Sequence, residues 1–183
     1  MNSIFGPYLR KFELVFFDDI LVYSTNLKDH IQHISIVFTL LIQHQLYAKL
    51  YKCTFAQPSL QYLGHIITAQ GDSADPDKIK CMEDWPIPTN FKQLKGFLGL
   101  TGYYRKFVRG YGTLCKPLTD LLKKNAFHWS FAALAAFNKV AMCTTPVLAL
   151  PDFSKPFVVE SDACTHGVGA VLMQEGRAIA FFS

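Results

Sequence analysis

The sequence lacks long apolar runs, paired cysteine motifs, internal repeats and low-complexity segments. No apolar run approaches the roughly 18–20 residues that span a membrane, and the first residues do not resemble a signal peptide. We therefore expect a protein that is neither secreted nor embedded in a membrane. The cysteines form no Cys-x-x-Cys pair, and an odd, unpatterned set indicates reduced thiols in an intracellular protein. They are Cys53, Cys81, Cys115, Cys143 and Cys164.

Acidic residues are scarce in one long stretch. Between Lys92 and Lys124 there are eight basic residues and a single acid, Asp120, although the net charge of the whole chain is only +4. Such a local excess is the electrostatic footprint of a surface that meets a polyanion. A solvated helix face is the alternative, and the charges alone do not decide between the two.

The chain is 50% hydrophobic and 14% aromatic, which is enough for a packed core in one domain or two small ones.

Two adjacent acids, Asp18 and Asp19, separate two apolar runs within residues 14–24. Each run has the length and the β-branched and aromatic composition of a strand, so we expect a β-hairpin over residues 13–23 with the acids at its turn. Neighbouring carboxylates repel each other, and a hard divalent cation with oxygen ligands relieves that repulsion. An ordinary hairpin turn is the alternative.

After the hairpin, residues 24–26 offer capping side chains, and an amphipathic helix is expected over residues 28–44. Its inner face should carry Ile31, Ile34, Phe38 and Leu41. His30 and His33 lie one turn apart, a spacing that can bind zinc. No second ligand pair stands nearby, so a polar helix face or a helix-end contact is the better interpretation.

Short strands are expected at residues 47–55 and 62–68, followed by a turn at residues 70–72. The second strand contains Gly64, and a glycine inside a strand often marks a bulge or the close approach of another backbone.

The next stretch, residues 75–143, should be almost wholly helical. Asp75-Pro76 is a typical helix start, and this helix should run to about Trp85. Further helices are expected from about residue 91 to 104, over 117–124, and after Ser130, with Phe131, Leu134 and Phe137 of the last facing inward. Three glycines in the second helix each weaken it by about 1 kcal/mol relative to alanine, which suggests close packing or close approach to a ligand.

Strand periodicity returns at 157–163, 168–174 and 178–182, with a hairpin turn at Glu175-Gly176.

Several phrases of this sequence resemble the polyproteins of Gypsy-class long-terminal-repeat retrotransposons. Phe16-Phe17-Asp18-Asp19 looks like the Tyr-x-Asp-Asp box of reverse transcriptases, with Phe16 in place of the tyrosine. Residues 97–107, Phe-Leu-Gly-Leu-Thr-Gly-Tyr-Tyr-Arg-Lys-Phe, are a long match to the same family. Asp162-Ala163-Cys164, followed by residues 167–172, resembles the opening of the ribonuclease H domain.

The resemblance covers essentially the whole chain and implies an α+β fold in three parts. Residues 1–72 would be the C-terminal part of a reverse transcriptase palm, with the catalytic hairpin and the primer grip. Residues 73–150 would be a helical thumb or connection. Residues 151–183 would be the first strands of a ribonuclease H-like domain.

The resemblance also implies the site residues and their partners. Asp18 and Asp19 would be catalytic ligands of Mg²⁺ or Mn²⁺ in an RNA-directed DNA polymerase, and Asp162 would hold metal for ribonuclease H. Leu63, Gly64 and His65 would belong to the primer grip. The residues expected to bind nucleic acid in the thumb are Lys92, Lys95, Arg105, Lys106 and Arg109. The partners would be an RNA template, a DNA primer, an RNA–DNA hybrid and deoxynucleoside triphosphates, in a cytoplasmic particle or the nucleus.

The family's third polymerase aspartate and its fingers would precede Met1, and further ribonuclease H acids would follow Ser183. We therefore expect this chain alone not to polymerise DNA. The rival hypotheses are a non-catalytic nucleic-acid-binding remnant and a relic without function.

Overall fold

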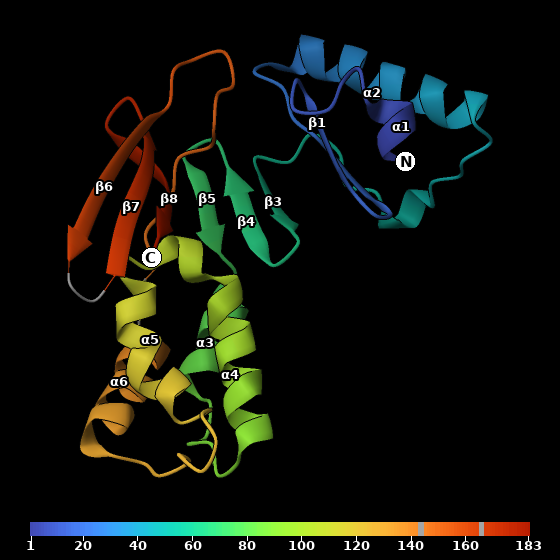
Figure 1. The fold of residues 1–183 in the computed structure, drawn as a ribbon. Coiled ribbons are helices and arrows are strands. Elements are labelled where there is room, and N and C mark those ends of the chain that lie inside the picture. Colours follow the sequence, from blue (N-terminus) through green and yellow to red (C-terminus); the bar gives the residue numbers. More distant parts are fainter. Residues whose placement is uncertain (143–144, 165–166) are drawn as a thin grey trace. The chain divides into compact units, whose positions relative to one another are not determined.

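The computed structural model describes residues 1–142, 145–164 and 167–183, which form helices and antiparallel sheets in the α+β arrangement expected (Figure 1). Two compact units are present, residues 1–58 and residues 59–183. Cys143, the last residue of the expected helical stretch, lies outside the described residues. Within the described part of the chain, no helix is long and apolar enough to cross a membrane.

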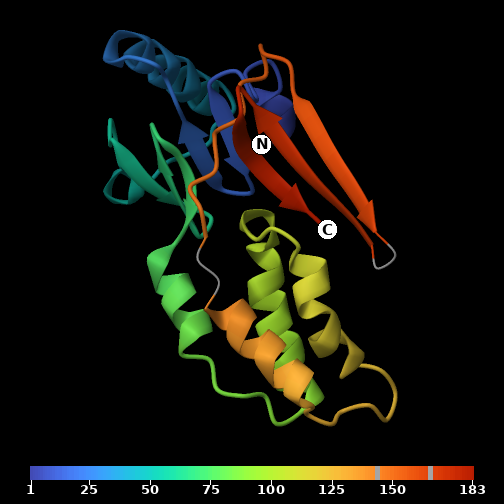
Figure 2. The same cartoon turned by 90° about the vertical axis from the view of Figure 1, so that its left-hand side faces the viewer.

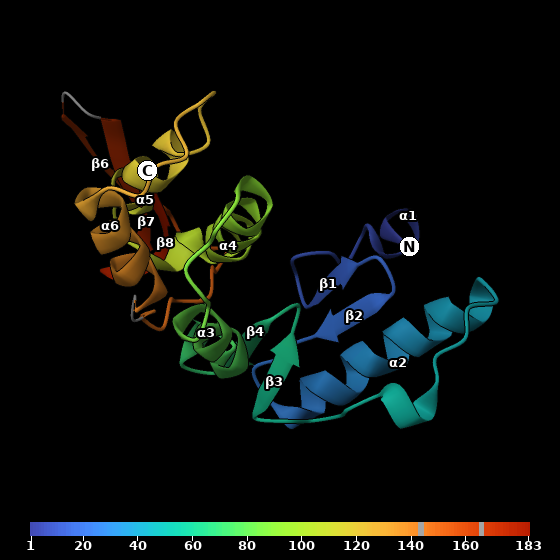
Figure 3. The ribbon, with the colours of Figure 1, turned by 90° about the horizontal axis from the view of Figure 1, so that it is seen from below.

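The first unit contains the expected hairpin. Its elements are α1 (Asn2–Phe5), β1 (Glu13–Phe16), β2 (Asp19–Val22), α2 (Leu27–Gln43) and the 3₁₀ turn η1 (Leu50–Lys52). β1 and β2 pair antiparallel with Phe16 opposite Asp19, and Figure 3 shows α2 lying beside this hairpin. The hairpin prediction is therefore confirmed, with Asp18 in the turn and Asp19 as the first residue of β2.

Helix α2 begins where the capping residues predicted, because the Asn26 side chain accepts a hydrogen bond from the backbone N–H of Asp29. Its buried face agrees with the expected one at Leu41 and differs from it at Ile31 and Phe38, which are exposed. Val37 and Leu41 pack in the core of the first unit, whereas the side chain of Ile31 is 60% exposed. The expected strand over residues 47–55 is wrong, since this segment forms only η1. Aromatic and apolar composition alone cannot make a strand where no neighbouring strand supplies backbone partners.

The second unit opens with a three-stranded antiparallel sheet of β3 (Ser59–Tyr62), β4 (His65–Thr68) and β5 (Gly71–Ala74). Leu63 and Gly64 form the tight turn between β3 and β4, so Gly64 lies in a turn and not in a strand bulge as the sequence suggested. Asp72 of β5 also bonds to a later segment. Its backbone N–H donates to the Leu148 carbonyl, and the Leu148 N–H donates to the Asp72 carbonyl, both at 2.8 Å.

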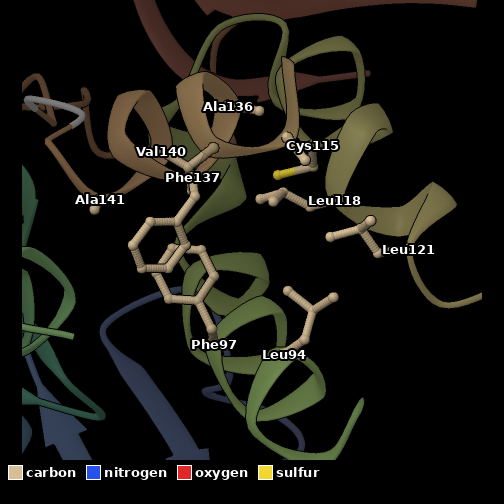
Figure 4. Close-up of a cluster of buried hydrophobic side chains, with 10 residues drawn as sticks. Leu94, Phe97, Cys115, Leu118, Leu121, Ala136, Phe137, Val140 and Ala141 are labelled. Carbon is tan, nitrogen blue, oxygen red and sulfur yellow. The ribbon is translucent and has the colours of Figure 1, made fainter. Parts of the chain in front are cut away.

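Five helical segments follow: α3 (Pro76–Glu83), α4 (Phe91–Tyr103), the 3₁₀ turn η2 (Arg105–Phe107), α5 (Tyr111–Asp120) and α6 (Phe131–Ala141). The Asp75, Asn90 and Ser130 side chains cap α3, α4 and α6 by accepting backbone N–H bonds. This confirms the expected helix starts at Asp75 and Ser130, and it selects Asn90 where the sequence allowed either Thr89 or Asn90 as the cap of α4. Helices α4, α5 and α6 pack together in Figure 2. Figure 4 shows their core, in which the rings of Phe97 and Phe137 face each other with centroids 4.6 Å apart.

Two helical expectations need correction. Helix α5 begins at Tyr111 and includes Pro117, whereas the sequence suggested a start at Pro117; burial of Cys115 and Leu118 stabilises the extra turns. Helix α6 presents Ala133 and Ala136 to the core, with Phe131 89% exposed. Small side chains let neighbouring helices approach closely, and this packing outweighs the burial of one large ring.

The last elements are β6 (Val158–Cys164), β7 (Gly167–Gln174) and β8 (Arg177–Phe182), an antiparallel sheet in that order. The three expected strands and the Glu175-Gly176 turn are confirmed. Ala178 and Phe181 of β8 pack on a second core, which contains Met82, Tyr104 and Phe107. This sheet is therefore attached to the helices through η2 and α4.

Candidate catalytic and nucleic-acid-binding sites

The hairpin turn of the first unit presents two exposed carboxylates, Asp18 and Asp19. Phe17 precedes them with φ = 51°, a left-handed conformation that bulky residues rarely adopt. Its side chain is also 78% exposed. Strain of this kind persists only where the surrounding structure enforces it, and it is concentrated at functional sites.

These carboxylates are hard oxygen ligands of the type that Mg²⁺ prefers. They supply only part of a coordination shell, because the described residues contain no cluster of three or more His, Cys, Asp or Glu side chains able to hold a metal ion. Asp162 likewise has no such cluster around it among the described residues.

Glu13, at the base of the same hairpin, is a feature that the sequence analysis did not identify. Its side chain is fully buried, and neither carboxyl oxygen has a hydrogen-bond partner. Burial raises the pKa of Glu13 to about 7. The sequence did contain a sign of this burial, because side chains two residues apart in a strand point to the same face. Glu13 therefore lies on the same face as Val15, which is partly buried against the core of the first unit.

His30 and His33 have a structural role. The Nδ1 atoms of both rings lie within hydrogen-bond distance of the Ser24 hydroxyl, at 3.2 and 2.7 Å, and the His33 ring stacks on Phe12. The helix-end interpretation is therefore confirmed.

The turn between β3 and β4 contains Leu63 and Gly64, two of the residues expected to form the primer grip. Its backbone is bonded to the end of α4. Leu63 and Gly64 have φ values of 51° and 75°, the positive pair typical of a type I′ turn. The Tyr103 hydroxyl donates to the Leu63 carbonyl at 2.6 Å, and the Tyr104 hydroxyl donates to the Gly64 carbonyl at 2.9 Å. Sequence reasoning singled out the turn and missed the tyrosines, because nothing in the sequence pairs residues that lie 40 positions apart.

A polar network lies next to this turn. Asp72 is buried, and its carboxylate accepts a hydrogen bond from Lys106 Nζ at 2.7 Å; its other oxygen lies 3.1 Å from His65 Nδ1. Burial opposes ionisation of Asp72, but the bonds and charges of His65 and Lys106 outweigh it, so the pKa of Asp72 is lowered. Two expected nucleic-acid-binding residues, His65 and Lys106, thus bond to Asp72.

The other four expected basic residues, Lys92, Lys95, Arg105 and Arg109, are exposed. Among the described residues none of the four forms an ion pair. Lys92 and Lys95 share the outward face of α4 with Gly99 and Tyr103, because residues three and four apart are neighbours on a helix. A Cβ atom at Gly99 would meet no atom within 4 Å, so packing inside the unit does not require glycine there.

Asp162 lies within β6, opposite Gly169 of β7. The expected strand covered residues 157–163, and β6 extends one residue further, to Cys164, because the pairing with β7 continues. Asp162 is exposed, and it lines a cleft of about 410 Å³ together with Glu160 of β6 and Arg109 from the segment before α5. Two acidic residues and one basic residue therefore line the same cleft.

Two family models match this chain. Residues 1–67 match the model described as reverse transcriptase (RNA-dependent DNA polymerase), and residues 129–183 match the RNase H-like domain found in reverse transcriptase. The retrovirus-related Pol polyprotein from transposon 297 of Drosophila melanogaster is 43% identical over 187 residues, and the polyprotein from transposon gypsy of the same species is 32% identical over 198 residues. Both matches cover 100% of this chain.

The chain belongs to the family of retrovirus-related Pol polyproteins. It spans 18% of the transposon 297 polyprotein and 19% of the gypsy polyprotein. An uncharacterized mitochondrial protein of Arabidopsis thaliana is 53% identical over 130 residues, which cover 69% of this chain and 82% of that protein. Reverse transcriptase and RNase H-like domains generally depend on divalent metal ions.

Solved structures share the fold of this Pol region. The foamy viral protease-reverse transcriptase in complex with double-stranded DNA matches 99% of this chain and 33% of its own, with a TM-score of 0.86 and 21% identity. The same viral protein in complex with an RNA/DNA hybrid matches 98% of this chain and 25% of its own, with a TM-score of 0.85.

Proposed function

We propose that this Pol region acts in RNA-directed DNA polymerisation during retrotransposon replication, and that it also begins a ribonuclease H domain. The observation that carries the proposal is the pair of exposed carboxylates, Asp18 and Asp19, on a tight hairpin of strained backbone. A short hairpin holds its turn residues more rigidly than a loop, and nucleotidyl transfer needs ligands held in that way.

In this proposal Asp18 and Asp19 hold Mg²⁺ or Mn²⁺ through their carboxylate oxygens. The metal ions supply activation of the primer 3′-hydroxyl and stabilisation of the pyrophosphate leaving group. The contribution of the first unit is to fix the two carboxylates on the hairpin. Asp162 serves a separate hydrolysis of RNA in an RNA–DNA hybrid.

Nucleic acid would be held by the second unit. Lys92 and Lys95 on α4, with Arg105 and Arg109 beyond its end, offer unpaired positive charge to phosphates. The Leu63-Gly64-His65 segment would hold the 3′ end of a DNA primer on an RNA template. Deoxynucleoside triphosphates are the substrates in this proposal, and the place of action is a cytoplasmic particle or the nucleus.

Metal binding at the hairpin is tested by titrating the chain with Mn²⁺ and following free Mn²⁺ by electron paramagnetic resonance. The expected result is weak binding that is lost in the Asp18→Asn, Asp19→Asn double variant. The matched control is Glu83→Gln, Asp84→Asn, since these are also adjacent exposed acids. Equal binding by all three proteins would overturn the assignment of the hairpin as the metal site.

Duplex binding is tested by fluorescence anisotropy with a DNA primer on an RNA template over a range of salt concentrations. The affinity should fall steeply with salt, because each phosphate contact contributes about 0.9 to the slope of log affinity against log salt. Changing Lys92, Lys95, Arg105 and Arg109 to alanine should flatten that slope. Alanine at Lys49, Lys52, Lys78 and Lys139 removes the same charge and should leave it nearly unchanged. A slope that depends on the control set instead would contradict the proposed interface.

A second function is favoured by one observation. Among the described residues, Asp18 and Asp19 have no third carboxylate beside them, as expected of a remnant that binds nucleic acid without catalysis. Duplex binding with no Mn²⁺ binding at the hairpin would favour this non-catalytic role.

A further inference from the structure

Two consecutive carbonyls of the Leu63-Gly64 turn are held by two consecutive tyrosines. Tyr103 ends α4, Tyr104 follows it, and their hydroxyls donate to Leu63 and Gly64 respectively. The Gly64 carbonyl also accepts the backbone N–H of Asp75 at 3.2 Å, so the turn is joined to the start of α3 as well.

The Tyr104 hydroxyl is well suited to this contact. Its side chain is only 3% exposed and packs in the core that contains Met82 and Phe107. Burial, with smaller contributions from Tyr103 and Asp75, raises the pKa of Tyr104 to about 12, so the hydroxyl stays protonated and can donate at neutral pH. A Cβ atom at Gly64 would lie 2.8 Å from this oxygen. Glycine at this position therefore serves both the positive φ and the close approach of the tyrosine.

The residue that follows the turn is anchored too. The His65 ring packs on the rings of Tyr103, Tyr104 and Phe107, with centroid distances between 5.5 and 5.8 Å. Its Nδ1 faces Asp72, which also accepts Lys106 from η2. The turn is thus bonded directly to Tyr103 and Tyr104 at the end of α4, and His65 is connected to η2 through Asp72. Both α4 and η2 lie next to the exposed basic residues.

We propose that Tyr103 and Tyr104 are positioning residues that lock the Leu63-Gly64 turn to helix α4, so that the helix contacting the duplex also sets the place of the primer 3′ end. This rests on the proposed function, because it takes the turn as the segment that meets the primer. Neither hydroxyl is assigned a chemical role. Each acts by restricting the backbone that holds the primer terminus.

The test compares the full chain with the Tyr103→Phe, Tyr104→Phe double variant, which removes both hydroxyls and keeps both rings. Tyr111→Phe is the control, since the Tyr111 hydroxyl is bonded to Thr101 at 2.8 Å within the same unit and away from the turn. The first readout is amide hydrogen exchange of residues 62–66 without nucleic acid. The double variant loses two hydrogen bonds, each worth about 1 kcal/mol, so this exchange should speed up about thirty-fold in it and stay unchanged in the control.

The second readout is photocrosslinking from a DNA primer on an RNA template, with a photoreactive thymine analogue at the primer 3′ end. The unaltered chain and Tyr111→Phe should crosslink within residues 62–65, as located by mass spectrometry of the peptides. In the double variant the yield within residues 62–65 should fall below that of both other proteins, while the duplex dissociation constant stays nearly constant. A purely structural role would not separate the two quantities.

The outcomes separate the two proposals. Unchanged exchange in the double variant, or crosslinking at the turn that persists there, would overturn the positioning role while duplex binding still stands. Absence of duplex binding by the unaltered chain would overturn the proposed function and, with it, any role of the turn at a primer, whatever the exchange data show.

Discussion

Lys106 donates a hydrogen bond from its Nζ to Oδ2 of Asp72 at 2.7 Å, and the two side chains are 39% and 12% exposed. This pair joins η2 to β5, and it explains why a lysine in the basic stretch is only partly available to a polyanion. Lys106 should therefore be mutated separately from the other basic residues of that stretch.

Asp72→Asn should destabilise the second unit by about 2–3 kcal/mol, because it weakens a buried ion pair and leaves Lys106 without its charged partner. The folded pKa of Asp72 is lowered, so its stabilising contribution is present above the unfolded pKa of about 4 and is lost as the pH falls through the folded pKa. Urea unfolding at pH 7 and at about pH 2, well below the unfolded pKa, measures both effects. The variant should lose most of its deficit at the lower pH, and a deficit independent of pH would contradict this account.

Glu13→Val should stabilise the first unit by about 1–3 kcal/mol at pH 8, since it removes a buried carboxylate without partners. Because the folded pKa of Glu13 is raised to about 7 from 4.5, the unaltered chain should lose stability as the pH rises between these two values. Thermal unfolding from pH 4 to pH 8 should show this decline and its absence in the variant. Glu83→Gln, at an exposed acid, should leave the decline in place.

Gly99→Ala should separate stability from nucleic-acid binding. Alanine is favoured by about 1 kcal/mol in a helix, and its Cβ would meet no atom of the chain within 4 Å. The folded state should therefore become more stable, whereas a duplex that approaches this face should bind more weakly. Chemical unfolding and fluorescence anisotropy measure the two properties. Tighter or unchanged binding would show that the duplex does not approach α4 at this position.

Phe17→Gly should relieve the left-handed backbone strain of the hairpin that carries Asp18 and Asp19. A non-glycine residue in this conformation costs about 1–2 kcal/mol, although glycine also gains freedom in the unfolded chain, so a net gain of about 1 kcal/mol is expected. Mn²⁺ binding at Asp18 and Asp19 should persist. The centroids of the Phe16 and Phe17 rings are 4.8 Å apart. A loss of stability would show that this ring contact stabilises the hairpin by more than the backbone strain destabilises it.

The chain as it stands should not extend a primer. Asp18 and Asp19 have no third ligand beside them among the described residues, and transfer depends on metal ions held in a complete shell. The assay is primer extension on a poly-A template with Mg²⁺ or Mn²⁺. Extension that disappears in the Asp18→Asn, Asp19→Asn variant would prove the expectation wrong.

Local chemistry made part of this fold predictable. Asp75, Asn90 and Ser130 indicate helix starts, because a short polar side chain at the N-cap position can accept a hydrogen bond from a free backbone N–H of the first turn. The hairpin around Asp18 was equally clear, since two strand-like runs meet without a helix signal between them. These features depend on neighbours in sequence.

The features that escaped prediction depend on partners far along the chain. The aromatic segment around Tyr47 reads as a strand by composition, yet no strand pairs with it. The buried face of α6 was predicted correctly at Phe137 but not at Phe131, which looks like a core residue until the alanines on the other side of the helix are seen to meet the core. The family resemblance directed attention to the Leu63-Gly64 turn, but the roles of Tyr103, Tyr104 and Asp72 follow only from the three-dimensional contacts.

The return of the chain to Asp72 through Leu148 has a consequence for folding kinetics. The β3–β5 sheet cannot complete its hydrogen bonds until the helices between β5 and Leu148 have folded and brought that residue back. Contacts between distant residues require a costly loop closure and form slowly. In pulse-labelled refolding, the Asp72 and Leu148 amides should therefore gain protection after the amides of α4, and the sheet that carries the Leu63-Gly64 turn should be among the last parts of the second unit to become rigid.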